Sequence, residues 1–191
     1  MKFVCTADTH DFHRSLAIPV GDVFIHAGDV ADRRGKLIDF NQMLEKLPHK
    51  YKLIIRGNHD LLWGKEHGSL QKILTNGMVL NNSGIRIEEI KIWGTPWMGN
   101  IALIPEDTDI LVSHVPPWGI GDLSNRGIHK GSRELLEKVK EVKPKYHIFG
   151  HVHEGYGVRK ELVGNREIVF MNVVAIIGFG SRFQEPKVFE L

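Results

Sequence analysis

The chain reads Phe-Val-Cys-Thr-Ala-Asp-Thr-His from residue 3 to residue 10, a short apolar run that ends in an aspartate and a histidine. Short apolar runs bounded by polar or glycine residues are typical of buried strands. The pattern recurs at residues 23–26, which lead into residues 28–33, and at residues 52–56, which lead into residues 57–60. We therefore expect a sheet of buried strands whose carboxyl ends carry polar loops.

Two further apolar runs, at residues 109–112 and 146–149, add to these predicted strands. Between the runs, apolar residues recur at helical spacing and stop near a proline or an Asn-Gly pair. This pattern predicts helices at residues 36–47, 68–75 and 132–142. Strands that alternate with helices indicate an α/β fold with a parallel sheet.

Other segments have short apolar runs separated by tight polar turns, a pattern that favours antiparallel hairpins. These runs lie at residues 78–80, 85–87, 91–93, 157–163, 167–172 and 187–191. Two mixed β-sheets packed face to face as a sandwich, with helices outside, accommodate both kinds of segment. No internal repeat, low-complexity tract or linker marks a boundary, so we predict a single domain over residues 1–191.

Composition narrows the class of protein. The 25 basic and 23 acidic residues nearly balance, so the net charge of +2 leaves nucleic acid possible as a partner without indicating it. The only cysteine, Cys5, lies in an apolar run, which excludes a disulfide within the chain and fits a reducing compartment. Since no apolar stretch is long enough for a signal peptide or a membrane span, we expect a cytoplasmic protein without membrane association.

The residues that carry chemistry follow the ends of predicted strands. Ligands bind beyond the carboxyl ends of strands in open α/β sheets, so motifs far apart in sequence can converge on one crevice. Each motif alone would suit a turn or a cap, but five in succession make chance a poor explanation. Oxygen and imidazole donors without thiolates suit manganese, iron, zinc or nickel. The motifs are Asp8-Thr9-His10, residues 28–33, residues 57–60, Ser113-His114 and residues 150–153.

These five motifs resemble, in order, those of the calcineurin-like metallophosphoesterase superfamily. Residues 93–97, 113–119 and 150–157 resemble a narrower branch, the vertebrate brain metallophosphoesterase-domain proteins and their bacterial relatives. The resemblance implies a sandwich of two sheets flanked by helices and a dinuclear centre that hydrolyses phosphoesters through a hydroxide bridging two divalent metal ions. Two such ions, two carboxylates and one hydroxide leave a single positive charge to face an anionic substrate. Manganese is the preferred metal.

The resemblance also implies individual roles. His59 would protonate the leaving oxygen, and Asp60 could hold the His59 ring by a hydrogen bond. Some relatives have glycine where this chain has His151, so the full ligand set indicates an active enzyme. One metal ion would be held by Asp8, His10, Asp29 and His153, and the other by Asn58, His114, His151 and the shared carboxylate of Asp29.

Further side chains are candidates to support the site or contact the substrate. Asp32 and Arg33 fit either a supporting role or a solvated turn. Trp97, Trp118 and Tyr156 neighbour the site loops, where they could stack on a base or simply pack. Asn172 ends a late strand and could support the site. We expect packed or surface roles for the remaining histidines, which are His13, His26, His49, His67, His129 and His147.

The narrower resemblance favours a small phosphodiester, such as a cyclic nucleotide, over a phosphomonoester. A nuclease or a protein phosphatase is the alternative enzyme, although a nuclease would need an extended, positively charged groove to bind its substrate. From a different class, the chain could be a metal-bound interaction module with slight turnover. The sequence does not indicate the oligomeric state.

Overall fold

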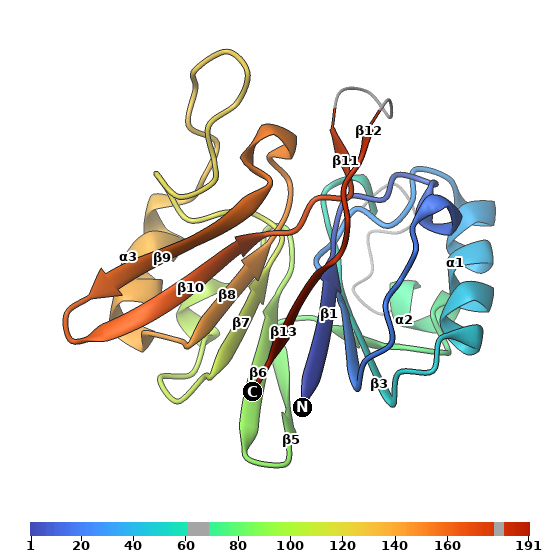
Figure 1. Ribbon diagram of the computed structural model, residues 1–191, viewed down its shortest axis with the longest axis horizontal. Helices are drawn as coiled ribbons and strands as arrows, with labels where there is room; N and C mark the ends of the chain where they lie inside the picture. The colour runs from blue at the N-terminus through green and yellow to red at the C-terminus, as the bar shows by residue number, and fades with distance from the viewer. Residues whose placement is uncertain (61–68, 178–181) are drawn as a thin grey trace.

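Two large sheets stand face to face in the computed structural model, which describes residues 1–60, 69–177 and 182–191. Helices cover the outer face of each sheet (Figure 1). These two mixed sheets with few helices confirm the predicted α/β class. The single domain over residues 1–191 stays a prediction. No helix within the described ranges is both long and apolar enough to cross a bilayer.

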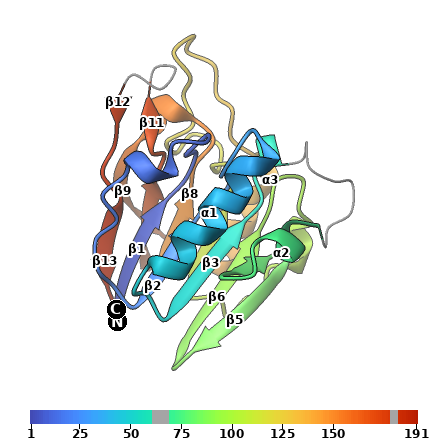
Figure 2. The same cartoon turned by 90° about the vertical axis from the view of Figure 1, so that its right-hand side faces the viewer.

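The first sheet has the strand order β13-β1-β2-β3-β4. Its strands from β1 to β4 run parallel, whereas β13 pairs antiparallel with β1. Two helices pack on its outer face, as the view onto that face shows (Figure 2). The elements are β1 (Lys2–Thr6), β2 (Val23–His26), β3 (Tyr51–Ile55), β4 (Met78–Leu80), β13 (Lys187–Glu190), α1 (Arg34–Lys46) and α2 (Ser69–Ile73).

The second sheet has the order β5-β6-β7-β8-β10-β9. Its four inner strands are parallel, and β5 and β9 pair antiparallel at the edges. A small antiparallel hairpin, β11 with β12, stands apart. The elements are β5 (Ser83–Ile87), β6 (Ile90–Thr95), β7 (Ile110–Ser113), β8 (Tyr146–Phe149), β9 (Gly157–Val163), β10 (Arg166–Asn172), β11 (Ile176–Ile177), β12 (Arg182–Phe183), α3 (Arg133–Val142) and the 3-10 turns His13–Ser15, Ile101–Leu103 and His153–Gly155.

One predicted hairpin strand is wrong. Met78–Leu80 was expected to pair antiparallel with its successors, but β4 runs parallel to β3 at the edge of the first sheet. The reason is that α2 precedes β4, and a chain that returns through a helix arrives in the parallel direction. The hairpins of β5 with β6 and of β9 with β10 are confirmed. Gly68, the predicted start of the second helix, lies outside the described residues.

Side chains of the parallel strands are buried on both faces. Phe3 and Cys5 of β1 point between the two sheets, whereas Val4 points toward α1. Burial on both sides explains why these strands are continuous apolar runs. Cys5 is fully buried, and burial raises the pKa of its thiol, as expected for a small core side chain.

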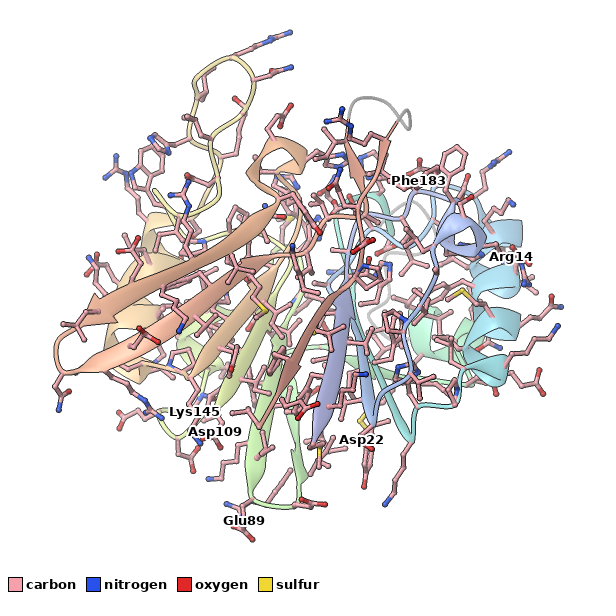
Figure 3. All side chains as sticks on the ribbon, in the orientation of Figure 1. Arg14, Asp22, Glu89, Asp109, Lys145 and Phe183 are labelled. Carbon is pink, nitrogen blue, oxygen red and sulfur yellow. The ribbon has the colours of Figure 1, made fainter. Side chains whose placement is uncertain are left out.

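The two sheets are joined at the carboxyl ends of their parallel strands. The Ala7 amide donates to the Val173 carbonyl (2.8 Å), and the Ala175 amide donates to the Ala7 carbonyl (2.7 Å). Both chain termini lie at the opposite end, near polar pairs such as Asp109 with Lys145 (Oδ1 to Nζ 3.1 Å; Figure 3). The loops that follow the parallel strands are therefore gathered at one end of the sandwich.

Candidate metal centre

The structure brings the predicted ligands together from both sheets. The loops after β1, β2 and β3 supply one half, and the loops after β7 and β8 supply the other. One possible ligand atom from each member of three sets lies within 4.8 Å of the others in its set. The sets are Asp8, His10 and His153; Asp8, Asp29 and His114; and His10, Asp29 and His59.

Around Asp8, ring nitrogens face carboxylate oxygens at slightly more than hydrogen-bond distance. His153 Nε2 lies 3.5 Å and His10 Nε2 lies 4.0 Å from Asp8 Oδ1. His10 Nε2 also lies 3.9 Å from Asp29 Oδ2. Ligand atoms that each lie about 2.1 Å from one ion are roughly 3 to 4 Å apart, so this spacing suits a common divalent ion.

Around His114, the ring Nδ1 donates to the Ala27 carbonyl (2.8 Å), which fixes the tautomer so that Nε2 faces the site. His114 Nε2 lies 2.9 Å from Asn58 Oδ1 and 3.5 Å from Asp29 Oδ2, and the His151 ring centroid is 5.1 Å from that of His114. Nε2 and both oxygens are acceptors in this tautomer, so the arrangement calls for a positive charge among them.

Protonation equilibria show the same demand for positive charge. Burial lowers the pKa of His114, but the Asp29 carboxylate outweighs it and raises the pKa to about 9. Burial also raises the pKa of Asp29, while contact with His114 lowers it more, well below its usual range. The site therefore keeps an anionic carboxylate and attracts a proton or a metal cation.

Asp8 provides the clearest test of whether a metal fits. Its Oδ2 accepts from the His151 amide (2.9 Å), whereas its Oδ1 is buried and has no hydrogen-bond partner among the described residues. A buried carboxylate oxygen without a partner is costly, and a divalent cation would satisfy it. The donor set therefore fits divalent metal ions.

Several ligands occupy strained backbone conformations. Positive φ angles are found at Asp8 (53°), His10 (40°), Asp29 (54°) and His151 (69°). Non-glycine residues adopt this region uncommonly, and such strain persists only where the surrounding structure enforces it. Close packing also requires glycine at position 57, where a Cβ atom would collide with the Asp29 carboxylate.

The predicted hydrogen bond between Asp60 and the His59 ring is wrong. Asp60 is buried beneath the turn, where it accepts from the backbone amides of Gly57 (2.8 Å) and Asp29 (2.9 Å). Burial, together with the nearby Asp29 carboxylate, raises the pKa of Asp60 to about 6. His59 Nδ1 instead lies 2.9 Å from Asp32 Oδ1, so Asp32 is the carboxylate that holds the exposed His59 ring.

The other supporting candidates divide into two groups. Asn172 is buried and donates to the carbonyls of Val152 (2.9 Å) and Gly121 (3.0 Å), which steadies the turn between His151 and His153. Arg33 is 70% exposed and pairs with Asp11 (2.6 Å), outside the ligand set.

Only one of the three predicted aromatic platforms meets the ligands. The Trp97 ring centroid lies 5.1 Å from that of His151. The Trp118 ring instead stacks beneath the Arg133 guanidinium (3.9 Å). Tyr156 donates to the Glu185 carbonyl (2.9 Å).

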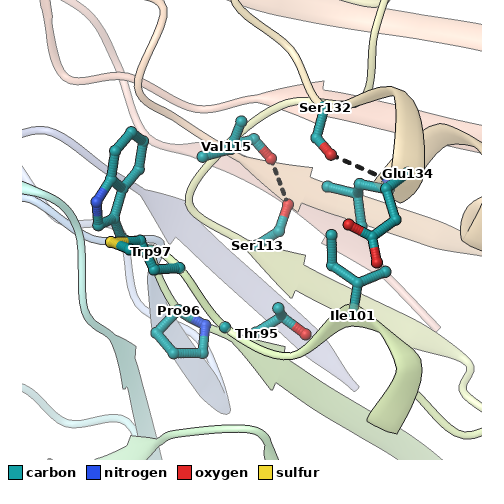
Figure 4. A pocket seen from close by; sticks show the side chains of 11 residues that line it. Thr95, Pro96, Trp97, Ile101, Ser113, Val115, Ser132 and Glu134 are labelled. Carbon is teal, nitrogen blue, oxygen red and sulfur yellow. Dashed lines mark hydrogen bonds between the residues drawn. The ribbon is translucent and has the colours of Figure 1, made fainter.

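A cavity of about 260 Å³ lies beside Trp97 and was not predicted (Figure 4). Pro96, Ile101 and Leu135 form part of its apolar lining, and the exposed Glu134 belongs to its wall. Thr95, Pro96, Trp97, Ser113 and Val115 of its lining fall within segments marked by resemblance. The other lining residues come from distant elements, which no local pattern brings together.

Comparison with known proteins agrees with this arrangement. A family model for calcineurin-like phosphoesterase matches residues 1–155. A UPF0046 protein of Caenorhabditis elegans is 36% identical over 225 residues, which cover 99% of this chain and 74% of the relative. Metallophosphoesterase domain-containing protein 1 of Homo sapiens is 33% identical over 201 residues, which cover 82% of this chain and 62% of the relative.

Solved structures share the fold at low sequence identity. Phosphopantetheinyl hydrolase from Mycobacterium tuberculosis has a TM-score of 0.62 at 13% identity, covering 91% of this chain and 88% of that one. The TT1561 protein of Thermus thermophilus has a TM-score of 0.59 at 14% identity, covering 90% of this chain and 89% of that one. The ordered motifs, the converged ligands and the family match over residues 1–155 together show that the chain belongs to the calcineurin-like phosphoesterase family, whose members are metal-dependent hydrolases.

Proposed function

We propose that this protein hydrolyses small phosphodiesters, with cyclic nucleotides as the first candidates, at a centre of two divalent ions. The observation that carries the proposal is the position of Asp29, whose carboxylate lies within reach of His10 on one side and His114 on the other. One ion would be held by Asp8, His10, Asp29 and His153, and the other by Asn58, His114, His151 and Asp29. Two bound metal ions, with manganese as the first candidate, would supply an activated water and positive charge for in-line displacement.

His59 is the proposed acid. Its side chain is 45% exposed at the rim of the site, and its Nδ1 lies 2.9 Å from Asp32 Oδ1, so that Nε2 can face a substrate. An imidazole held in this way can donate a proton to the leaving oxygen. Because His10 Nδ1 lies 3.3 Å from the same Asp32 oxygen, one carboxylate orients both a ligand and the acid.

The cavity beside Trp97 is the proposed site for the organic group of the ester. Trp97 contributes an aromatic face next to His151, and Ser113 and Val115 of the cavity wall flank the ligand His114. The Glu134 carboxylate would accept a hydrogen bond from an amino group and would repel a second phosphate. These features favour a small diester over a polynucleotide or a phosphoprotein. The lone buried Cys5 supports a reducing, cytoplasmic location.

The test uses metal-stripped protein resupplied with manganese, and bis-p-nitrophenyl phosphate alongside p-nitrophenyl phosphate. We expect diester cleavage that requires the metal and that falls roughly 100- to 10,000-fold in kcat in His59→Ala while the bound metal is retained. His129→Ala is the matched control, because its ring is similarly exposed (39%) but pairs with Asp122 outside the ligand set. Two bound metals without cleavage of either substrate would favour an interaction module instead.

A further inference from the structure

Two buried histidines lie close to the metal centre without belonging to the ligand set. His26 ends β2 in the first sheet, and His147 lies in β8 of the second. Both side chains are fully buried, and both point to the outer face of their sheet, away from the space between the sheets. His26 contacts Phe40 of α1 (ring centroids 5.3 Å apart), and His147 contacts Phe170 of β10 (5.8 Å).

His26 is linked to the turn that carries the first two ligands. Its Nε2 lies 3.0 Å from the hydroxyl of Thr9, and this hydroxyl donates to the Val30 carbonyl (2.9 Å). Thr9 stands between the ligands Asp8 and His10, and Val30 directly follows Asp29. The chain of bonds therefore ties the first ligand turn to the second.

His147 makes the equivalent link in the other sheet. Its Nε2 lies 2.8 Å from the hydroxyl of Ser113, which donates to the Val115 carbonyl (2.7 Å; Figure 4). Ser113 and Val115 stand on either side of the ligand His114. The bond therefore clamps the backbone across that ligand.

The direction of these bonds fixes the protonation of both rings. A carbonyl only accepts, so each hydroxyl proton goes to the carbonyl and the hydroxyl oxygen must accept from the histidine. Nε2 therefore carries the proton, and the two Nδ1 atoms have no hydrogen-bond partner in the described part of the chain. Burial lowers the pKa of each ring to about 3, so both act as neutral donors.

Simple packing does not account for this chemistry. A leucine would fill such a site without burying an unpartnered ring nitrogen, which carries a desolvation cost. The buried histidines stabilise the turns that carry the ligands, because Asp8, His10 and Asp29 all have positive φ angles that the surroundings must maintain. A buried donor at each turn restricts the hydroxyl, the carbonyl and hence the backbone between them.

We propose that His26 and His147 are positioning residues that hold the ligand-bearing turns in the geometry that binds metal. This inference rests on the proposed metal centre. It assigns to each sheet one histidine, one hydroxyl and one carbonyl that act through the ligands without touching the substrate.

The experiment measures manganese affinity by calorimetry on metal-stripped protein, with kcat, KM and Tm measured in parallel. His26→Leu and His147→Leu remove the donor, whereas His26→Gln and His147→Gln place an amide NH near the position of Nε2. We expect the leucine variants to lose about tenfold in manganese affinity, and the glutamine variants to stay within about twofold of wild type. His49→Leu is the control, since His49 is buried against Phe24 (5.6 Å), away from the ligand turns, and should change only Tm.

The inference is overturned if folded leucine variants bind manganese as wild type does, if leucine and glutamine weaken binding equally, or if wild type binds no manganese. Should a leucine variant fail to fold, Thr9→Val and Ser113→Ala remove the accepting hydroxyl with little change of shape and are expected to give the same tenfold loss. Unchanged affinity in those variants would equally refute it. Wild-type protein that binds manganese but hydrolyses nothing would refute the proposed function alone, because the affinity comparison is independent of turnover.

Discussion

The two buried histidines, His26 and His147, also allow a prediction of how the stability of the protein changes in acid. The pKa of His26 and that of His147 both fall to about 3 in the folded protein, whereas an exposed histidine titrates near 6.5. The unfolded chain therefore binds more protons than the folded chain between these two pH values. Lowering the pH destabilises a protein wherever the unfolded chain binds more protons than the folded chain. The stabilisation that each neutral ring contributes is therefore complete above about pH 7 and is lost as the pH falls below 6.5.

The magnitude follows from linkage. Each histidine should lower the free energy of unfolding by about 2 kcal/mol between pH 7 and pH 5, with a limiting slope of about 1.4 kcal/mol per pH unit. Together the two rings should remove about 4 kcal/mol, a large share of the roughly 5 to 15 kcal/mol that stabilises a typical domain.

The assay is urea denaturation in the presence of a chelator at pH 7, 6 and 5, for wild type and for the double variant His26→Gln/His147→Gln. All other groups titrate in both proteins, so the difference between their unfolding free energies isolates the two rings. We expect this difference to shift by about 4 kcal/mol in favour of the variant between pH 7 and pH 5, and by half as much in each single variant. A difference that stays constant over this range would mean that the folded rings accept protons, and would refute the reasoning.

Three further predictions concern the site. Asp32→Asn should lower kcat about tenfold, because it releases the His59 ring, and should also weaken metal binding through His10. Asp60→Asn should lower metal content, because it breaks bonds beneath the turns, but should keep the contact of His59 with Asp32; kcat measured at saturating manganese, beside elemental analysis, separates the two. Gly57→Ala should abolish high-affinity manganese binding in a calorimetric titration, since a Cβ there collides with Asp29, whereas Gly35→Ala, with open space around the position, should bind normally. Trp97→Ala should raise KM for an aromatic diester with little change in kcat, and equal losses in both would contradict a platform role.

Much of the fold follows from local pattern. Residues 23–26 were predicted as a buried strand and form β2 with those bounds, because an apolar run flanked by polar loops favours a strand that is buried on both faces. The α3 helix begins at Arg133, one residue after its predicted start, since Ser132 accepts from the Leu135 amide as its cap. The predicted antiparallel pairing of Met78–Leu80 was wrong, because the strand that it pairs with depends on where α2 returns the chain to the sheet.

The site divides in the same way. Strand ends and residue chemistry were sufficient to select Asp8, His114 and His153 as a group, because carboxyl ends of parallel strands meet at one edge. Asp60 was misassigned because neighbours in sequence need not face one another; the backbone of the turn points its carboxylate inward to four amides.

The sequence by itself therefore determined the strands, the polar loops that end them and the kinds of ligand these loops carry, because each of these depends on residue type and short spacing. Only the tertiary structure decided that Asp32 holds His59 and that His26 and His147 reach the ligand turns. These contacts join segments tens of residues apart, and the direction of a side chain across such a distance is set by packing between the sheets and helices.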